Sequence, residues 1–236
     1  MLCKIADLVV DVPDAGGLAS RCREYRCEEK AGADIIVRTE LYRKDRYDPR
    51  IDKRVLAYME SAYQFYLELI NYGGFYLHSS AVVRDGKAYL FSGPSRVGKS
   101  THTRLWQQTF GPEARVINDD KPAIRLMDGK WIAYGTPWCG KDGLNENASA
   151  PIAGVCFLKK APHNAIRRLS SLEAATRILT QTIHKVDSED VLDNLLELLN
   201  RFVEEVPVYE LENLPEPASA MLSFETMRQG ALENGL

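Results

Sequence analysis

Hydrophobic residues recur at helical spacing in several long stretches of the chain. Residues 54–71 are apolar around most of a helix circumference, which predicts a helix that is buried on more than one side and ended by Gly73-Gly74. Residues 188–204 repeat leucine at helical spacing, so one face of a second helix is expected in the core. The same spacing predicts helices over residues 172–184 and in the tail from residue 219.

Shorter apolar runs between turn residues predict a sheet. These runs are residues 4–12, 35–37, 75–83, 87–92, 115–118, 124–127, 130–134, 152–158, 166–169 and 208–211. Arg84-Asp85-Gly86 and Asp128-Gly129 are turns too short to join anything but antiparallel neighbours, because parallel strands need a crossover of about a dozen residues. The patterns therefore predict an α/β (α+β) fold with a mixed, largely antiparallel sheet and flanking helices. A small N-terminal sheet subregion is expected at residues 1–52 and a larger domain at residues 53–236.

One loop between a predicted strand and a predicted helix has the pattern G-x-x-x-x-G-K-[ST], which is typical of a phosphate-binding loop. Its glycines allow a tight turn that presents backbone N–H groups to phosphate oxygens. Lys99 is expected to reach the β- and γ-phosphates, and the Ser100 hydroxyl to bind Mg²⁺. We therefore expect ATP, or another nucleoside triphosphate, to bind with Mg²⁺ at this loop. The expected binding residues are Gly93, Pro94, Ser95, Arg96, Val97, Gly98, Lys99, Ser100 and Thr101.

Composition narrows the range of partners and locations. A net charge of −3 gives no electrostatic basis for nucleic-acid binding. No apolar run approaches the ~20 residues that cross a bilayer, and the N-terminus lacks a signal-peptide pattern, so we expect a cytoplasmic protein without a membrane partner. The cysteines are odd in number and scattered, which predicts reduced thiols and no structural metal. The sequence leaves a homo-oligomer open.

Two features outside the loop carry candidate chemistry. Asp119 and Asp120 follow a predicted strand that comes directly after the loop helix. Phosphoryl transfer to a hydroxyl needs one carboxylate on the metal and one that accepts the hydroxyl proton, and two adjacent acids can do both. A solvated turn is the alternative interpretation of the pair. His78 precedes Gly93 by fifteen residues and is expected near the γ-phosphate or the acceptor, although alone it is equally typical of a core or edge histidine.

The glycine-rich loop over residues 135–143 supplies one more candidate. Lys141 is expected to contact phosphate or acceptor. Cys139, in the same loop, has no histidine placed to activate it, so we do not expect a nucleophilic cysteine. His102 lies on the predicted loop helix and is expected to have a structural or surface role.

The order of histidine, hairpin, phosphate loop and Asp-Asp over residues 76–158 resembles the HPr kinase/phosphorylase family, which shares its fold with ATP-dependent phosphoenolpyruvate carboxykinases. It is similar above all to HPr-kinase-like proteins, some of them encoded beside peptide-modification systems. The resemblance implies that the family histidine is His78, that Asp119 is the general base, and that Asp120 lies by the metal. The loop carries Arg96 where the family usually has glycine, and the later Arg-Gly-Leu-Gly-like segment is absent, so HPr is not the expected acceptor.

These observations predict an ATP-dependent kinase that phosphorylates a hydroxyl, with serine as the first candidate, on a peptide, protein or small molecule. Asp119, Lys99, His78 and Lys141 are the expected catalytic residues, and Ser100 and Asp120 the expected Mg²⁺ ligands. The alternative is an accessory protein of a peptide-modification or regulatory system that binds nucleotide and hydrolyses it weakly or not at all. The acceptor and the choice between ATP and GTP stay open.

Overall fold

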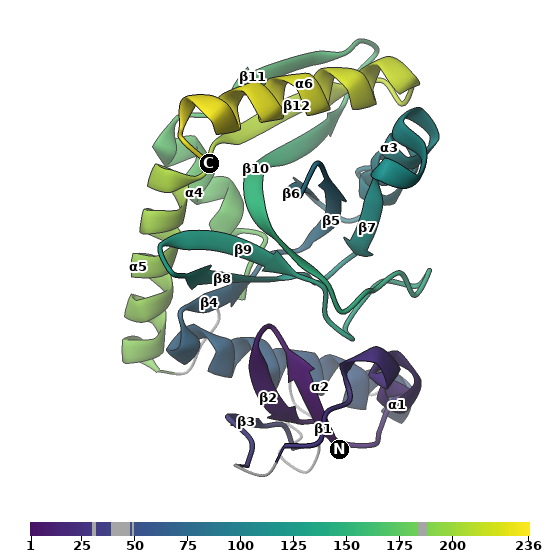
Figure 1. Cartoon of the computed structure of the whole chain (residues 1–236), viewed down its shortest axis with the longest axis vertical. Helices are drawn as coiled ribbons and strands as arrows, with labels where there is room; N and C mark the ends of the chain where they lie inside the picture. The colour runs from purple at the N-terminus through teal and green to yellow at the C-terminus, as the bar shows by residue number, and fades with distance from the viewer. Residues whose placement is uncertain (30–31, 39–47, 49, 184–187) are drawn as a thin grey trace.

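The protein consists of a large mixed sheet with helices on both faces and a small sheet at its N-terminal end (Figure 1). The structure is a computed structural model, and it describes residues 1–29, 32–38, 48, 50–183 and 188–236. Within these residues the large sheet has nine strands, in the order β4-β8-β9-β10-β6-β5-β7, with β12 beside β10 and β11 beside β12. They are β4 Gly74–Tyr76, β5 Ser79–Arg84, β6 Lys87–Ser92, β7 Arg115–Asn118, β8 Ala123–Met127, β9 Lys130–Tyr134, β10 Ser149–Lys160, β11 Ala165–Arg168 and β12 Val208–Asn213.

Strand β10 joins the parts of this sheet. Its first residues pair antiparallel with β9, its middle pairs in parallel with β6, and its last half pairs in parallel with β12. The other pairings within the described part of the large sheet are antiparallel. The predicted mixed, largely antiparallel fold class is therefore confirmed.

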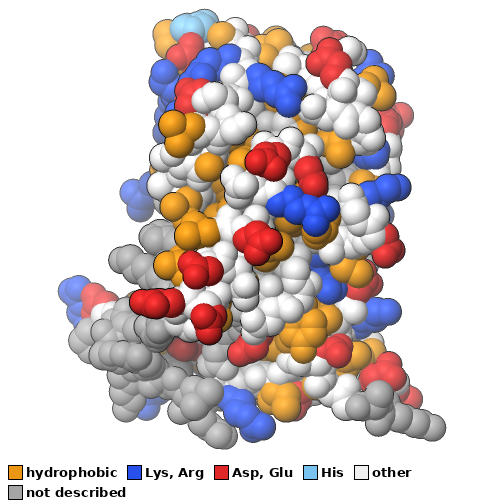
Figure 2. All heavy atoms as spheres, turned by 90° about the vertical axis from the view of Figure 1, so that its left-hand side faces the viewer, with side chains coloured by type: hydrophobic (Ala, Val, Ile, Leu, Met, Phe, Trp, Pro, Cys, Tyr) orange, Lys and Arg blue, Asp and Glu red, His pale blue; other side chains and the backbone are white. Residues whose placement is uncertain are grey.

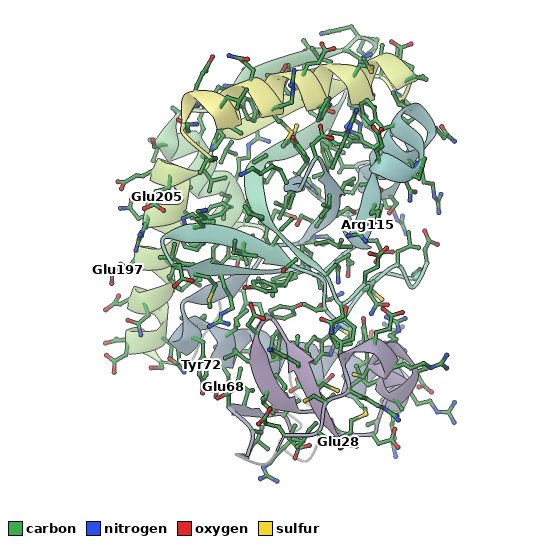
Figure 3. The ribbon with its side chains drawn as sticks, in the orientation of Figure 1. Glu28, Glu68, Tyr72, Arg115, Glu197 and Glu205 are labelled. Atoms are coloured by element: carbon green, nitrogen blue, oxygen red, sulfur yellow. The ribbon has the colours of Figure 1, made fainter. Side chains whose placement is uncertain are left out.

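Helices cover both faces of the sheet because its central strands are apolar on both sides. Along β6, Leu90 faces a core shared with α4 Ser171–Leu179 and α5 Glu189–Glu205, whereas its neighbours Tyr89 and Phe91 face a core shared with α3 Lys99–Phe110 and α6 Pro217–Glu233. This alternation is the two-residue period of a strand. Acidic side chains gather on the outer face beside α5 (Figure 2), where Glu197 and Glu205 are labelled in Figure 3.

The N-terminal region forms its own sheet and packs on the large α2 helix. Strands β1 Leu2–Ile5, β2 Leu8–Asp11 and β3 Ile35–Ile36 lie beside α2 Lys53–Leu69, as the lower part of Figure 1 shows. Short helices α1 Leu18–Arg21 and η1 Arg23–Tyr25 follow the first hairpin. Their buried residues share one core with α2 and with Trp138 of the glycine-rich loop. The predicted helix over residues 54–71 is confirmed, continuing as η3 Ile70–Tyr72 to a left-handed Gly73.

Three predicted elements differ from the structure. Residues 4–12 form a hairpin, not one strand, because Ala6 and Asp7 adopt positive φ (51° and 61°) and reverse the chain. Residues 75–83 form two strands, since the chain leaves β8 after Tyr76 and joins β6 and β7 from Ser79. The helix predicted to residue 184 ends as α4 at Leu179.

Some predictions fall outside the described residues. His184, the expected end of the helix predicted over residues 172–184, is one of the residues outside the described part of the chain. Within the described residues, no helix is long and apolar enough to cross a membrane.

Candidate functional site

The phosphate-loop sequence connects β6 directly to α3. Gly93 and Gly98 adopt positive φ angles of 138° and 118°, which glycine reaches without steric cost. Arg96 also lies in the left-handed region, with φ 66°, so a side chain stands where the backbone favours glycine. Loops that mix left-handed and other residues can present successive N–H groups to an anion, and α3 begins at Lys99, directly after this loop. The loop has the backbone of an anion site.

Lys99 is held inside this loop. Its side chain is only 8% exposed, and its Nζ donates to the Gly93 carbonyl oxygen at 2.9 Å and to that of Pro94 at 3.5 Å. Burial lowers the pKa of Lys99, while the negative charge of Asp120 acts in the opposite direction. The two carbonyl contacts thus hold the Lys99 ammonium group against the loop, and Asp120 of the acid pair is close enough to influence its charge.

The acid pair is shaped by Asn118, the residue directly before it, for which the sequence predicts no role of its own. Strand β7 begins at Arg115, labelled in Figure 3, and ends at Asn118. The Asn118 Oδ1 accepts from the backbone N–H groups of Asp120 at 3.0 Å and Lys121 at 2.6 Å, which closes an Asx turn. Its Nδ2 donates to the carbonyl oxygen of Trp138 at 3.1 Å. One buried amide therefore holds the acid turn and the glycine-rich loop together.

Asp119 is the buried member of the pair, with 6% of its surface exposed. Its Oδ1 accepts from the Gly140 N–H, and within the described residues its Oδ2 has no hydrogen-bond donor. A Cβ at position 140 would lie 2.8 Å from Oδ2, so a larger residue there would displace the Asp119 carboxylate. Burial raises the pKa of Asp119, and the hydrogen bond from Gly140 opposes that rise. Asp119 combines a free carboxylate oxygen with increased basicity.

Asp120 has the opposite electrostatics. Its Oδ1 lies 3.1 Å from His78 Nε2, and its Oδ2 accepts from the Lys121 ammonium. Burial acts to raise its pKa, but the hydrogen bond from His78 and the charge of Lys121 outweigh burial and hold the pKa well below its ordinary value. Asp120 is therefore ionised at neutral pH, as a metal-binding carboxylate must be.

His78 lies at the break between β4 and β5, not within a strand as predicted. Its Nδ1 lies 3.2 Å from Gln181 Oε1, and its backbone N–H donates to the Gln181 carbonyl oxygen at 2.8 Å. The break turns the imidazole toward Asp120, and Gln181 fixes the ring from the other side. Gln181 follows the end of α4 and carries no local signal in the sequence.

A cavity of about 420 Å³ brings the predicted residues together. Its lining includes His78, Ser95, Arg96, Gly98, Lys99, Ser100, Thr101, Asp119, Asp120 and Lys141. Gly93, Pro94 and Val97 are not part of this lining, although the Gly93 and Pro94 carbonyl oxygens accept from Lys99. Val97 instead lines an adjoining cavity of about 270 Å³ that shares Arg96, Gly98 and Thr101.

The residues set aside in the sequence lie outside this cavity. His102 is fully buried against Phe91, and its Nε2 lies 3.1 Å from Ser223 Oγ, which gives it a structural role. Burial lowers the pKa of His102 to about 4. Burial also raises the pKa of Cys139 to about 11, so its thiol stays protonated at neutral pH and is a poor nucleophile.

The donor set suits Mg²⁺. The Ser100 hydroxyl and the ionised Asp120 carboxylate line the same cavity as the phosphate loop, and both offer the oxygen ligands that Mg²⁺ requires. Mg²⁺ keeps several waters and takes its remaining ligands from phosphate, so two protein oxygens are enough.

Comparison with known proteins gives three findings. The profile of the family described as "SynChlorMet cassette protein ScmC" matches residues 46–214. No protein of curated function matches the chain. Among solved structures, the chain is similar to "Structure of the Hpr(Ser) kinase/phosphatase from Coxiella burnetii" at 13% identity, covering 67% of this chain and 91% of that chain with a TM-score of 0.39. A likeness this distant is a relation of fold at most and carries no argument about activity. Because the family profile spans well over half of the sequence, the chain belongs to the ScmC family.

Proposed function

We propose that this ScmC-family protein is an ATP-dependent kinase that transfers the γ-phosphoryl group to a hydroxyl of a peptide, protein or small molecule, with serine as the first candidate. One observation carries the proposal. The loop lysine, the acid pair and His78 come from three separate segments of the chain and line a single cavity. Structural ion pairs have no need of a neighbouring anion-binding loop, whereas phosphoryl transfer uses a phosphate-binding lysine, a metal-binding carboxylate and a base together.

The loop side of the cavity would hold the nucleotide. Its N–H groups and Lys99 would bind the phosphates, and Arg96 and Thr101 stand on the boundary with the adjoining cavity. That second cavity is also lined by Lys160, Asn213 and Pro215, and we assign the nucleoside to it. Ser100 and Asp120 would hold Mg²⁺, which neutralises phosphate charge when bound.

The acid side would act on the acceptor. Asp119 would take the hydroxyl proton on its free Oδ2, since its raised pKa makes it a better base than an exposed carboxylate. Asp120 stays ionised on the metal side, so the two carboxylates have separate roles set by their surroundings. His78 and Lys141 would stabilise negative charge at the γ-phosphate.

Thermal unfolding with Mg-ATP and Mg-GTP tests nucleotide binding. A ligand at about one hundred times its dissociation constant adds about 2.7 kcal/mol to the free energy of unfolding. We expect this stabilisation in the wild type and in Asp119→Asn, and its loss in Lys99→Ala. Absence of stabilisation in the wild type by either nucleotide would refute the proposal.

Labelling from γ-³²P-ATP tests the kinase step. The acceptors are a library of serine-, threonine- and tyrosine-containing peptides together with small alcohols. Transfer that requires both Lys99 and Asp119 supports a kinase. Nucleotide binding without transfer to any acceptor would favour the accessory, weakly hydrolytic alternative.

A further inference from the structure

The glycine-rich loop is held from outside the cavity by a tyrosine of α2. The Tyr58 hydroxyl donates to the Cys139 carbonyl oxygen at 2.7 Å and accepts from the Cys139 N–H at 2.6 Å. It also accepts from Arg21 Nη1 at 2.8 Å. A phenol has one proton to donate and two lone pairs to accept with, so the hydrogen-bonding capacity of Tyr58 is fully used here.

Arg21, at the end of α1, supports the same point. Its Nη1 also lies 3.1 Å from the Cys139 carbonyl oxygen and 3.2 Å from Cys139 Sγ, and its guanidinium stacks 4.8 Å from the centre of the Tyr58 ring. Arg21 therefore contributes a contact to the glycine-rich loop from a part of the sequence in which no site residue is predicted. Arg21 also lies outside the residues that the family profile matches.

These contacts reach Asp119 through one peptide group. The carbonyl oxygen of Cys139 and the N–H of Gly140 belong to the same planar, trans peptide unit. Tyr58 and Arg21 hold the oxygen of that unit, and its N–H donates to Asp119 Oδ1. Because the unit is rigid, fixing the oxygen fixes the direction of the N–H.

From this shared peptide plane, the geometry points to Tyr58 and Arg21 as positioning residues for phosphoryl transfer. They orient the Gly140 N–H so that Asp119 is held by Oδ1 and keeps Oδ2 free in the cavity. The assignment rests on the proposed function, in which Asp119 accepts the acceptor proton. It makes the N-terminal segment a part of the catalytic arrangement, although none of its residues is counted among the cavity-lining side chains.

Tyr58→Phe in the full-length chain tests the assignment. Tyr72→Phe is the matched control, because its hydroxyl donates to the Asp34 carbonyl oxygen at 2.7 Å and also ties the α2 end of the chain to the N-terminal sheet. Three quantities are measured: amide hydrogen exchange of Gly140 without ligand, the dissociation constant of Mg-ATP, and kcat for Mg-ATP with water as the acceptor.

In Tyr58→Phe we expect Gly140 to exchange about tenfold faster and kcat to fall about tenfold, with the dissociation constant unchanged, as the loss of a hydrogen bond predicts. The control should match the wild type in all three quantities. Wild-type values of exchange and kcat in Tyr58→Phe would overturn the assignment, and so would faster exchange at an unchanged kcat.

Two further outcomes remain decisive. If Tyr58→Phe does not fold, Arg21→Met replaces it, with changes of about threefold in the same directions, and wild-type values would again overturn the assignment. If the wild type does not bind Mg-ATP, the proposed function fails and the transfer role with it. The exchange measurement at Gly140 needs no nucleotide. Faster exchange in Tyr58→Phe would then show that the contacts of Tyr58 and Arg21 only stabilise the loop structure.

Discussion

The two sides of the cavity are built in different ways. The phosphate side is one continuous segment, in which a strand, a glycine-containing loop and a helix follow each other without a break. The acid side is assembled from distant segments: Asn118 orders the acid turn, Gly140 holds Asp119, and Gln181 fixes His78. In the proposed function, binding would therefore depend on local backbone shape, whereas transfer would depend on long-range hydrogen bonds. Changes on the two sides should therefore affect different steps.

The largest expected effect is on the acid side. Asp119→Asn should lower the rate of phosphoryl transfer about a thousandfold, as expected for loss of a general base. The dissociation constant of Mg-ATP should change less than about threefold. Asp142→Asn is the control, because Asp142 lines the same cavity but is paired with Arg104 at 2.6 Å. Transfer is measured by single-turnover labelling. Wild-type transfer by Asp119→Asn would contradict the proposed difference between the two sides of the cavity.

The same substitution should raise stability. Burial places the folded-state pKa of Asp119 above its unfolded value, so the ionised acid costs stability at neutral pH and that cost disappears as the pH falls. Neutral asparagine should therefore increase the free energy of unfolding at pH 7 by about 1 kcal/mol, measured by urea denaturation. A decrease would mean that the Gly140 hydrogen bond outweighs burial.

A long-range contact between α3, on the phosphate side, and α6 can be tested by pH. His102 and Trp106 of α3 both contact Ser223 Oγ of α6, at 3.1 Å and 3.0 Å. The pKa of His102 is lowered from 6.5 to about 4, so the unfolded chain binds a proton that the folded chain excludes between these values. Stability should be complete above pH 6.5 and fall by about 3 kcal/mol as the pH drops to about 4. His102→Gln should flatten this part of the thermal-unfolding profile. If the pH dependence of stability were unchanged in His102→Gln, it would arise from other titratable groups.

Gly140→Ala distinguishes shape from chemistry on the acid side. The added Cβ would meet Asp119 Oδ2 at 2.8 Å, so the carboxylate must move, and transfer should fall about thirtyfold, equivalent to about 2 kcal/mol. Gly143→Ala in the same loop is the control. Its φ of 70° strains an alanine, but no atom lies within 4 Å of the added Cβ. Both variants should lose about 1 kcal/mol or more of stability, and only Gly140→Ala should lose transfer. If both variants lost transfer equally, the loss would come from strain in the loop and not from the contact with Asp119.

The smallest expected effect concerns Arg96. Arg96→Gly relieves the left-handed conformation but gives the unfolded chain more freedom, so the free energy of unfolding should change by less than about 1 kcal/mol. Removing a cation from the loop should weaken Mg-ATP binding about threefold, measured by calorimetry. Tighter binding would mean that the arginine obstructs the loop.

The sequence predicted the parts of the molecule that depend on neighbours in the chain. The loop, its flanking strand and helix, and the hairpin at Asp85-Gly86 could be read directly, because turn chemistry and alternation are local. The hairpin at Ala6-Asp7 was missed since neither residue is glycine or asparagine. The break at His78 was missed because it is set by pairing with β8 on one side and with β6 and β7 on the other.

The sequence likewise predicted only the local features of the candidate site. Asp119 and Asp120 were found as a pair, but their opposite pKa shifts arise from the burial of Asp119 and from the contacts of Asp120 with His78 and Lys121, which depend on the fold. Asn118, Tyr58 and Gln181 act through single side-chain contacts with distant loops. No periodicity or spacing in the sequence marks such contacts.

The position of β10 in the sheet also determines when the site can form during synthesis. Strand β6 leads into the phosphate loop, yet its parallel partner is β10, where Phe91 pairs with Cys156, and β10 in turn pairs with β12 near the end of the chain. Non-local parallel pairing is slow, because the entropy of closing the intervening loop is lost before the strand contacts form. A nascent chain that has just completed its phosphate-loop sequence therefore lacks the strand that supports it. We expect nucleotide binding to begin only after β12 has left the ribosome.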